Sequence, residues 1–193
     1  MSWNNGELPE LKIAESQGMS SDRLSLIDGY LQGYVDQKKL AGSSFAVMRG
    51  GEMVYYNGFG YATRETEKTM QSDTIHRIYS MSKPITSVAL LTLYEQGKFQ
   101  LDDPIEKYLP EFKDMRVLTG GIAALPITRY AAQSITPRHI MTHTAGLSYG
   151  FEGVPHAVDE MYRYKKVGIF NENLATFSEK LAQMPLRFDP GSS

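Results

Sequence analysis

Residues 78–86 read Ile78-Tyr79-Ser80-Met81-Ser82-Lys83-Pro84-Ile85-Thr86, and an apolar run follows them. This run predicts a helix that begins beside Ser80 and ends near Gly97, a residue type that suits the position just after a helix. A serine and a lysine three residues apart project from one helix face, where a proton can pass between them. We expect an irregular first turn, because Pro84 disfavours helical geometry at Lys83.

The spacing of Ser80 and Lys83 suits acyl transfer. A serine hydroxyl is a weak nucleophile at neutral pH and needs a nearby group that accepts its proton. Lys83 can accept it if the apolar run buries the amine, since an exposed lysine stays protonated. The start of a helix also stabilises an oxyanion through its backbone N–H groups and its dipole. We therefore predict Ser80 and Lys83 as catalytic residues, although Ser-x-x-Lys is also typical of a solvated helix start.

Four stretches of the sequence carry a resemblance to a known family, and Ser80 and Lys83 lie in the first of them. They are residues 78–86, residues 97–105 with 108–112, residues 135–147, which include His143-Thr144-Ala145-Gly146-Leu147, and residues 185–191, which include Asp189-Pro190-Gly191. With them the chain resembles the serine β-lactamase and penicillin-binding-protein superfamily, in particular the class C β-lactamase-like branch that contains the family VIII carboxylesterases. The resemblance implies an α+β, β-lactamase/transpeptidase-like fold, with an antiparallel sheet flanked by helices and a mainly helical region.

The resemblance also implies a function. A serine hydrolase of this branch forms an acyl-enzyme on small carboxylic esters, as a carboxylesterase or an acyltransferase, and uses no cofactor. Two alternatives stay open: a β-lactamase or D-amino-acid peptidase with the same mechanism, and a non-catalytic binding protein. By analogy, Tyr149 and Phe151 bind the substrate from an aromatic stretch that also includes Met161, Tyr162 and Tyr164. Packing in a core or a lid is an equal alternative for this stretch.

One part of the pattern is missing from the printed residues. The branch has a tyrosine signature shortly after the Pro-Gly turn and a later strand with Lys-Thr-Gly, whereas this sequence stops at Ser193. We expect a C-terminal segment of the same enzyme, on this polypeptide or as a separate chain, to complete the site. Tyr55-Tyr56-Asn57 matches Tyr-x-Asn literally, but it precedes the nucleophile in an alternating segment and is interpreted as sheet.

Composition narrows the possible partners. The 193 residues, 41% of them hydrophobic, are enough for one real core. Twenty basic against twenty-two acidic residues, without a basic block, argue against a nucleic-acid partner. The sequence has no cysteine, no secretory signal pattern at Met1 and no run of membrane-spanning length. We expect a cytoplasmic enzyme with no membrane partner.

Other constellations are weaker. His139 and His143 are four residues apart, but no glutamate follows His139 and no third ligand is evident, so we expect packing histidines and no metal. A Ser-His-Asp triad stays possible by composition, yet no serine lies in a Gly-x-Ser-x-Gly elbow.

The remaining pattern predicts the order of elements. Helices are expected from Ser21 or Asp22, over 158–166, and over 174–184 with Asn173 as N-cap; residues 44–56 form a hairpin. Asp102 or Asp103 is expected to cap a short helix with Pro104 near its first turn, and Thr136 with Pro137 to begin another. Residues 120–134 are expected to form an irregular insertion. We expect residues 1–100 to form the sheet-layer portion and residues 101–193 the mainly helical region.

Overall fold

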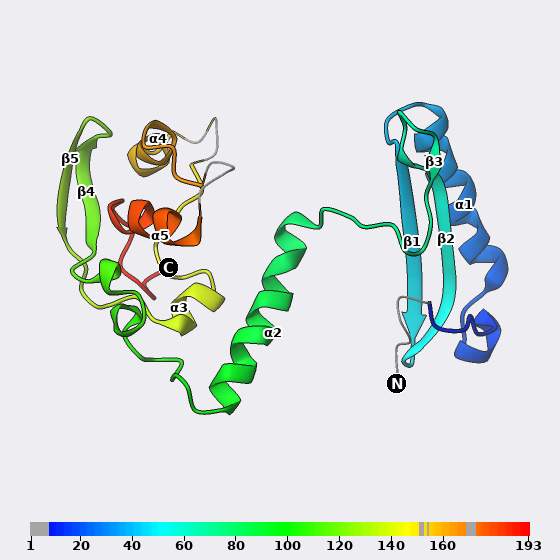
Figure 1. Cartoon of the computed structure of the whole chain (residues 1–193), viewed down its shortest axis with the longest axis horizontal. Helices are drawn as coiled ribbons and strands as arrows, with labels where there is room; N and C mark the ends of the chain where they lie inside the picture. The colour runs from blue at the N-terminus through cyan, green and yellow to red at the C-terminus, as the bar shows by residue number, and fades with distance from the viewer. Residues whose placement is uncertain (1–7, 151–152, 154, 169–172) are drawn as a thin grey trace. The chain divides into compact units, whose positions relative to one another are not determined.

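A computed structural model describes residues 8–150, 153, 155–168 and 173–193. The chain forms two compact units, Met1–Ile78 and Tyr79–Ser193, and each is described by itself (Figure 1). The first contains an antiparallel sheet with a helix, and the second combines helices with a small antiparallel hairpin. The expected α+β class is confirmed. The division of the protein at residue 100 stays a prediction.

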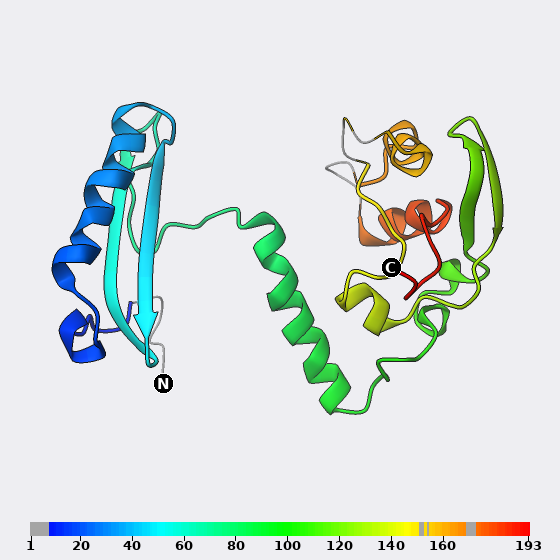
Figure 2. The ribbon, with the colours of Figure 1, turned by 180° about the vertical axis from the view of Figure 1, so that it is seen from behind.

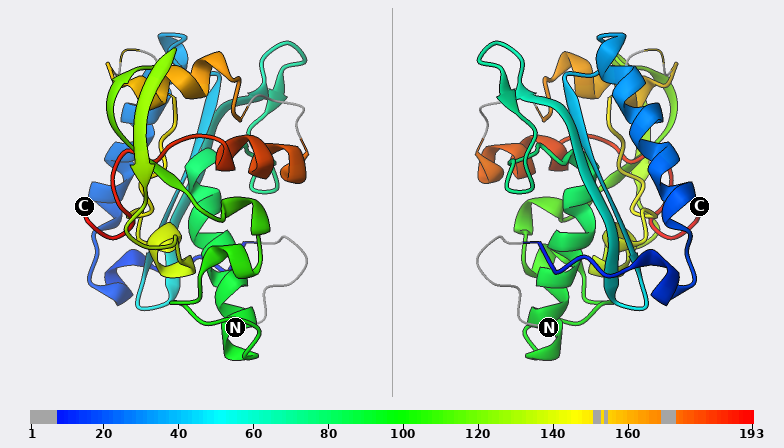
Figure 3. Two further views of the ribbon diagram at one scale, coloured as in Figure 1. Left: turned by 90° about the vertical axis from the view of Figure 1, so that its left-hand side faces the viewer. Right: turned by 90° about the vertical axis from the view of Figure 1, so that its right-hand side faces the viewer.

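The first unit is a three-stranded sheet with one long helix on it. Its elements are the 3₁₀ helix η1 (Ala14–Gln17), α1 (Ser21–Asp36), β1 (Gly42–Arg49), β2 (Glu52–Thr63) and β3 (Lys68–Thr69). The strand order is β1-β2-β3, and α1 runs along the β1–β2 hairpin (Figures 2 and 3). Ala14, Leu24 and Val54 form the buried core between helix and sheet. The helix begins at Ser21, as the sequence predicts, and Ser20 caps it.

The predicted hairpin is confirmed. β1 and β2 pair antiparallel from Gly42 opposite Gly60 to Arg49 opposite Glu52. The two residues between the strands, Gly50 and Gly51, have φ angles of 61° and 82°. Two consecutive positive φ values are what a tight turn between right-twisted strands requires, and glycine adopts them without strain.

The second unit is mainly helical. Its elements are η2 (Tyr79–Met81), α2 (Ser82–Glu95), η3 (Ile105–Lys107), η4 (Pro110–Phe112), β4 (Arg116–Ile122), β5 (Leu125–Tyr130), α3 (Pro137–Met141), α4 (Ala157–Tyr164) and α5 (Leu174–Ala182). Its main core gathers apolar residues from distant parts of the unit: Ile105, Phe112, Met115, Val117, Ile135, Ala145 and Leu186. The last helix leads into residues 185–191, where Leu186 forms a parallel bridge with Val117 of β4.

The expected irregular insertion is wrong for residues 120–130, because β4 and β5 form an antiparallel hairpin there, with one register shift between Leu118 and Gly120 (Figure 2). Gly121 pairs with Pro126, and a Cβ on Gly121 would lie 2.3 Å from the Leu125 carbonyl oxygen. Glycine and proline within the strands conceal the alternating pattern that marks a strand in sequence.

Of the predicted helix caps, those of α3 and α5 are confirmed and that of η3 is wrong. Thr136 accepts a hydrogen bond from the His139 N–H at the start of α3, and Asn173 accepts one from Thr176 at the start of α5, as predicted. The predicted Asp102 or Asp103 cap is wrong, because η3 has Pro104 at that position and no side-chain cap. Asp103 instead accepts hydrogen bonds from Tyr108, the Gln100 N–H and Lys107, which lower the pKa of its carboxyl to about 2.

Within the described residues, no helix combines the length and the apolar character needed to cross a bilayer.

Candidate active site

The nucleophile segment begins with an unusual backbone conformation. Tyr79 has a φ angle of 45°, a value that non-glycine residues seldom adopt. It opens the 3₁₀ turn η2, which runs directly into α2 with Met81 at the N-cap position and no side-chain cap. The irregular start is present, but it lies in the turn before α2, and Lys83 itself is helical despite the following Pro84. Ser80 lies inside this turn, next to the positive end of the helix dipole.

Ser80 and Lys83 face one another. The Lys83 Nζ donates a hydrogen bond of 3.1 Å to the Ser80 Oγ, across the three-residue spacing seen in the sequence. At this distance a proton can pass directly between the two side chains. The structure thus brings the two predicted residues into contact.

The expected burial of Lys83 is wrong for this chain. Ser80 and Lys83 are both exposed, and α2 has no buried residue. Ile85 and Val88, from the apolar run that was expected to cover the lysine, are themselves 64% and 62% exposed. Burial requires a second surface against the helix, and hydrophobicity along one segment cannot supply it.

Of the two predicted substrate-binding residues, the structure places Tyr149. Its ring lies over the Lys83 Nζ, with 5.6 Å between that nitrogen and the ring centroid. The side chain is exposed, as a surface for a substrate must be. Phe151 lies outside the described residues. The rest of the aromatic stretch divides, because Tyr162 is buried in a core with Val158 and Met184 whereas Tyr164 is exposed.

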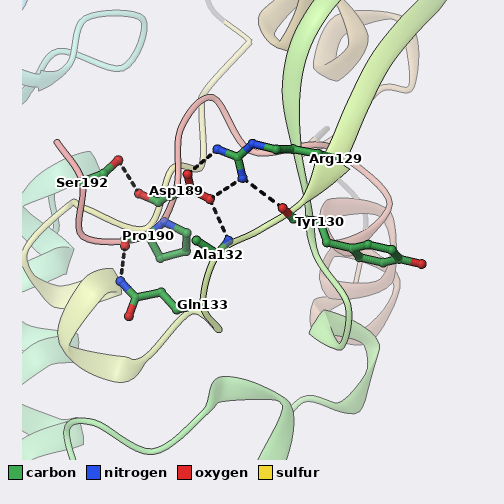
Figure 4. Close-up of polar contacts among 7 residues, drawn as sticks. All are labelled: Arg129, Tyr130, Ala132, Gln133, Asp189, Pro190 and Ser192. Atoms are coloured by element: carbon green, nitrogen blue, oxygen red, sulfur yellow. Dashed lines mark hydrogen bonds and ion pairs between the residues drawn. The ribbon is translucent and has the colours of Figure 1, made fainter.

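Residues 185–191 are held by polar contacts (Figure 4). The Asp189 carboxylate pairs with the Arg129 guanidinium and accepts a hydrogen bond of 2.8 Å from the Ala132 N–H. These contacts lower the pKa of Asp189 to about 2. The Gln133 side chain donates to the Pro190 carbonyl at 2.6 Å. The Gly191 N–H donates to the Thr144 carbonyl at 2.7 Å. The turn therefore has a fixed position within its unit.

The competing motifs have structural explanations. Tyr55 and Asn57 lie in β2 and both donate hydrogen bonds to Asp28 of α1, so the interpretation as sheet is confirmed. Burial, followed by the neighbouring Asp28 carboxylate, raises the pKa of Tyr55 to about 12. His139 closes the capping box of α3 by accepting a hydrogen bond from the Thr136 N–H. The described residues include no group of three histidines and acids that could hold a metal ion.

Sequence reasoning missed Asp159. This residue of α4 is 2% exposed, and its Oδ1 accepts hydrogen bonds from the Ser148 hydroxyl and the Gly150 N–H. It thereby holds the residues on both sides of Tyr149. A signal existed in the spacing, because Asp159, Tyr162 and Arg163 share one helix face at positions i, i+3 and i+4. An acid on a surface helix is nevertheless usually solvated, so the spacing alone did not single it out.

Comparison with known proteins decides the family. The beta-lactamase family model matches residues 27–193. The chain belongs to the beta-lactamase family. A curated relative, esterase EstB of Burkholderia gladioli, is 32% identical over 86% of this chain and 40% of its own length.

Two solved structures of beta-lactamase relatives support the fold. EstCE1, described as a hydrolase with promiscuous acyltransferase activity, is 31% identical over 90% of this chain and 44% of its own, with a TM-score of 0.70. A LovD6 mutant of simvastatin synthase from Aspergillus terreus is 29% identical over 91% of this chain and 42% of its own, with a TM-score of 0.68. The expected β-lactamase/transpeptidase-like fold is confirmed. The beta-lactamase-family chain spans less than half the length of each of these three relatives.

Proposed function

We propose that the protein containing this chain is a serine esterase that works through an acyl-enzyme, with small carboxylic esters as substrates. The observation that carries the proposal is the 3.1 Å hydrogen bond between Lys83 and Ser80 at the start of α2. An esterase and a hydrolase with acyltransferase activity among the relatives support the same class of reaction.

In the proposed reaction, the Ser80 Oγ attacks the ester carbonyl carbon while its proton passes to the amine of Lys83, which the segment beyond Ser193 and the bound substrate must cover for the amine to be neutral. The carbonyl oxygen becomes an oxyanion, which the backbone N–H of Ser80 and the start of α2 stabilise. Collapse of the tetrahedral intermediate breaks the bond to the alcohol oxygen, which leaves with the proton from Lys83. Water then attacks the acyl-serine, releases the carboxylic acid and restores the hydroxyl of Ser80. An alcohol in place of water gives acyl transfer.

Completion of the site is part of the proposal. We assign the rest of the proton relay to a tyrosine from a segment beyond Ser193, together with a second oxyanion donor. The resemblance to the class C-like branch and the coverage of less than half of each relative support this assignment. That segment belongs to the same enzyme, on the same polypeptide or on a separate chain.

The test is Ser80→Ala in the full-length protein, with Ser82→Ala as matched control. We expect Ser80→Ala to lower kcat/KM for p-nitrophenyl acetate or butyrate by at least about 10³-fold, because the covalent nucleophile is lost. It should also abolish labelling by a fluorophosphonate probe. Ser82→Ala should retain both activities, since Ser82 does not face Lys83. Unchanged hydrolysis by Ser80→Ala would contradict the proposal.

Substrate class is tested with the wild-type enzyme. We expect a higher kcat/KM for p-nitrophenyl esters than for nitrocefin or D-alanyl peptides. A preference for nitrocefin or the peptides would keep the mechanism and replace the esterase by a β-lactamase or a peptidase.

A further inference from the structure

Three residues of α4 hold the short segment Ser148–Gly150. The Ser148 hydroxyl and the Gly150 N–H donate to the Asp159 Oδ1 at 2.6 and 3.1 Å. The Ser148 N–H donates to the Tyr162 hydroxyl at 3.2 Å. Arg163 donates to the Gly150 carbonyl at 3.4 Å. The two neighbours of Tyr149 are therefore both fixed to one helix face.

The backbone at Gly150 lies against the same helix. Gly150 has a φ angle of 69°, and a Cβ there would lie 2.8 Å from the Cβ of Tyr162. No real side chain tolerates so short a contact, so the residue after Tyr149 must be a glycine for the segment to reach α4. The position of Tyr149 is thus set by backbone packing as well as by hydrogen bonds.

Asp159 is the central group of this arrangement. It is 2% exposed, and burying a carboxylate is costly unless polar partners surround it. Its Oδ1 accepts the two hydrogen bonds from the Ser148–Gly150 segment. Its Oδ2 has no hydrogen-bond partner among the described residues, but His156 Nδ1 and Arg187 Nη1 each lie 3.8 Å away. Because both hydrogen bonds of the buried carboxylate come from the Ser148–Gly150 segment, the acid points to a role in holding that segment.

Tyr149 connects this clamp to the nucleophile segment. Its ring lies 5.6 Å from the Lys83 Nζ, and that same nitrogen donates to the Ser80 Oγ. Before the amine loses its proton, the lysine ammonium on its flexible four-carbon stem samples many rotamers, and an aromatic face attracts it electrostatically. A fixed ring at this position favours the rotamers that keep the Lys83 Nζ near Ser80.

We propose that Asp159 is a positioning residue for the Ser80–Lys83 pair, acting through the Ser148–Gly150 segment and the Tyr149 ring. This inference rests on the proposed esterase function, and it adds a residue far along the chain to the machinery that orients the base. Asp159 touches neither the substrate nor the reacting atoms, so its effect must pass through Tyr149.

A double-mutant cycle in the full-length protein tests this route. Asp159→Ala and Tyr149→Ala are each expected to lower kcat/KM for p-nitrophenyl butyrate and the fluorophosphonate labelling rate about tenfold, because a displaced base acts less efficiently. The double variant should be no slower than Tyr149→Ala alone, since Asp159 has nothing left to position. Asp159→Asn is the matched control. Its amide oxygen can still accept both hydrogen bonds, so it should retain most of the activity.

A second readout does not depend on hydrolysis. Lysines are ¹³C-dimethylated reductively, and the Lys83 resonance is assigned as the one missing from Lys83→Arg. We expect a ring-current shift in the wild type that is lost in Tyr149→Ala and in Asp159→Ala, and kept in Asp159→Asn. This measurement decides the position of the ring even if Ser80→Ala shows that the esterase assignment is wrong.

Two outcomes would overturn the proposal: wild-type labelling and an unchanged Lys83 resonance in Asp159→Ala, or effects of Asp159→Ala and Tyr149→Ala that simply multiply in the double variant. If thermal melting shows that Asp159→Ala does not fold, Ser148→Ala replaces it in the cycle. That variant removes one of the two hydrogen bonds to Oδ1 and is expected to lower the labelling rate about threefold, again only when Tyr149 is present.

Discussion

The nucleophile segment and residues 185–191 are held in opposite ways. Ser80 and Lys83 are exposed, and the helix that carries them has no buried residue. In residues 185–191, by contrast, Leu186 is fully buried and Asp189 is paired with Arg129. The Ser80–Lys83 hydrogen bond joins two near neighbours in the sequence. Residues 185–191 are instead positioned by contacts with residues far away in the sequence. Changes in the first should therefore alter activity, and changes in the second should alter stability.

The largest effect is expected from Lys83→Met in the full-length protein. Loss of the amine should lower kcat/KM for p-nitrophenyl butyrate by about 10³-fold, because Ser80 loses its proton acceptor. The melting temperature should stay near the wild-type value, since the lysine is exposed. Lys98→Met, at an exposed lysine just beyond the same helix, is the matched control and should leave both quantities unchanged. A large drop in melting temperature for Lys83→Met would break the comparison.

Leu186→Ala should give the largest loss of stability. Leu186 is 0% exposed within the core of the second unit, so its truncation should cost about 2–5 kcal/mol through lost burial and a residual cavity. Ile85→Ala in α2 is the contrasting variant. It should cost less than about 1 kcal/mol, because the side chain is 64% exposed. Urea unfolding of the full-length protein measures both. An equal loss of unfolding free energy in Leu186→Ala and Ile85→Ala would show that α2 is covered in the complete enzyme.

Two glycines with similar positive φ angles, one in each region, test whether their surroundings differ in packing. Gly191 and Gly97 have φ angles of 77° and 68°, but a Cβ on Gly191 would lie 2.9 Å from His139 Nε2, whereas one on Gly97 meets nothing within 4 Å. Gly97→Ala should cost about 1–2 kcal/mol for the left-handed conformation alone. Gly191→Ala should cost more, since His139 must also move. Equal denaturation midpoints would refute the close packing of the turn.

The smallest effect concerns Asp189 and is visible through its pH dependence. The Arg129 hydrogen bonds and the Ala132 N–H lower the pKa of this carboxyl to about 2, below the value of about 4 usual in an unfolded chain. Its stabilisation is therefore complete above pH 4 and is lost as the pH falls towards 2. Asp189→Asn should be less stable than the wild type at pH 6, with a difference that shrinks between pH 4 and 2. Arg129→Gln should give the same pattern, and a pH-independent difference would contradict the assignment.

Sequence patterns predicted what depends on neighbours along the chain. The Ser80–Lys83 contact follows from their three-residue spacing. The caps at Thr136 and Asn173 follow from side chains that reach an N–H group three residues away. The β1–β2 hairpin follows from two glycines between alternating strands. Each of these features has its cause within a few residues.

Sequence patterns failed to predict features whose conformation or role depends on contacts that the local pattern does not show. The β4–β5 hairpin contains Gly121 and Pro126, which look like loop residues until their pairing is seen. Asp103 resembles a cap but is held by Lys107 and Tyr108 instead. The role of Asp159 depends on a segment about ten residues earlier that folds back onto its helix.

The sequence by itself determined the beta-lactamase family of this chain, its α+β class and the Ser80–Lys83 pair, because these depend on residue identity and on short-range geometry. Only the tertiary structure decided that Lys83 is exposed, that Tyr149 lies over it, and that a buried acid on α4 fixes the residues around that ring. Burial and side-chain contact depend on which surfaces meet after folding, and no local pattern contains that information.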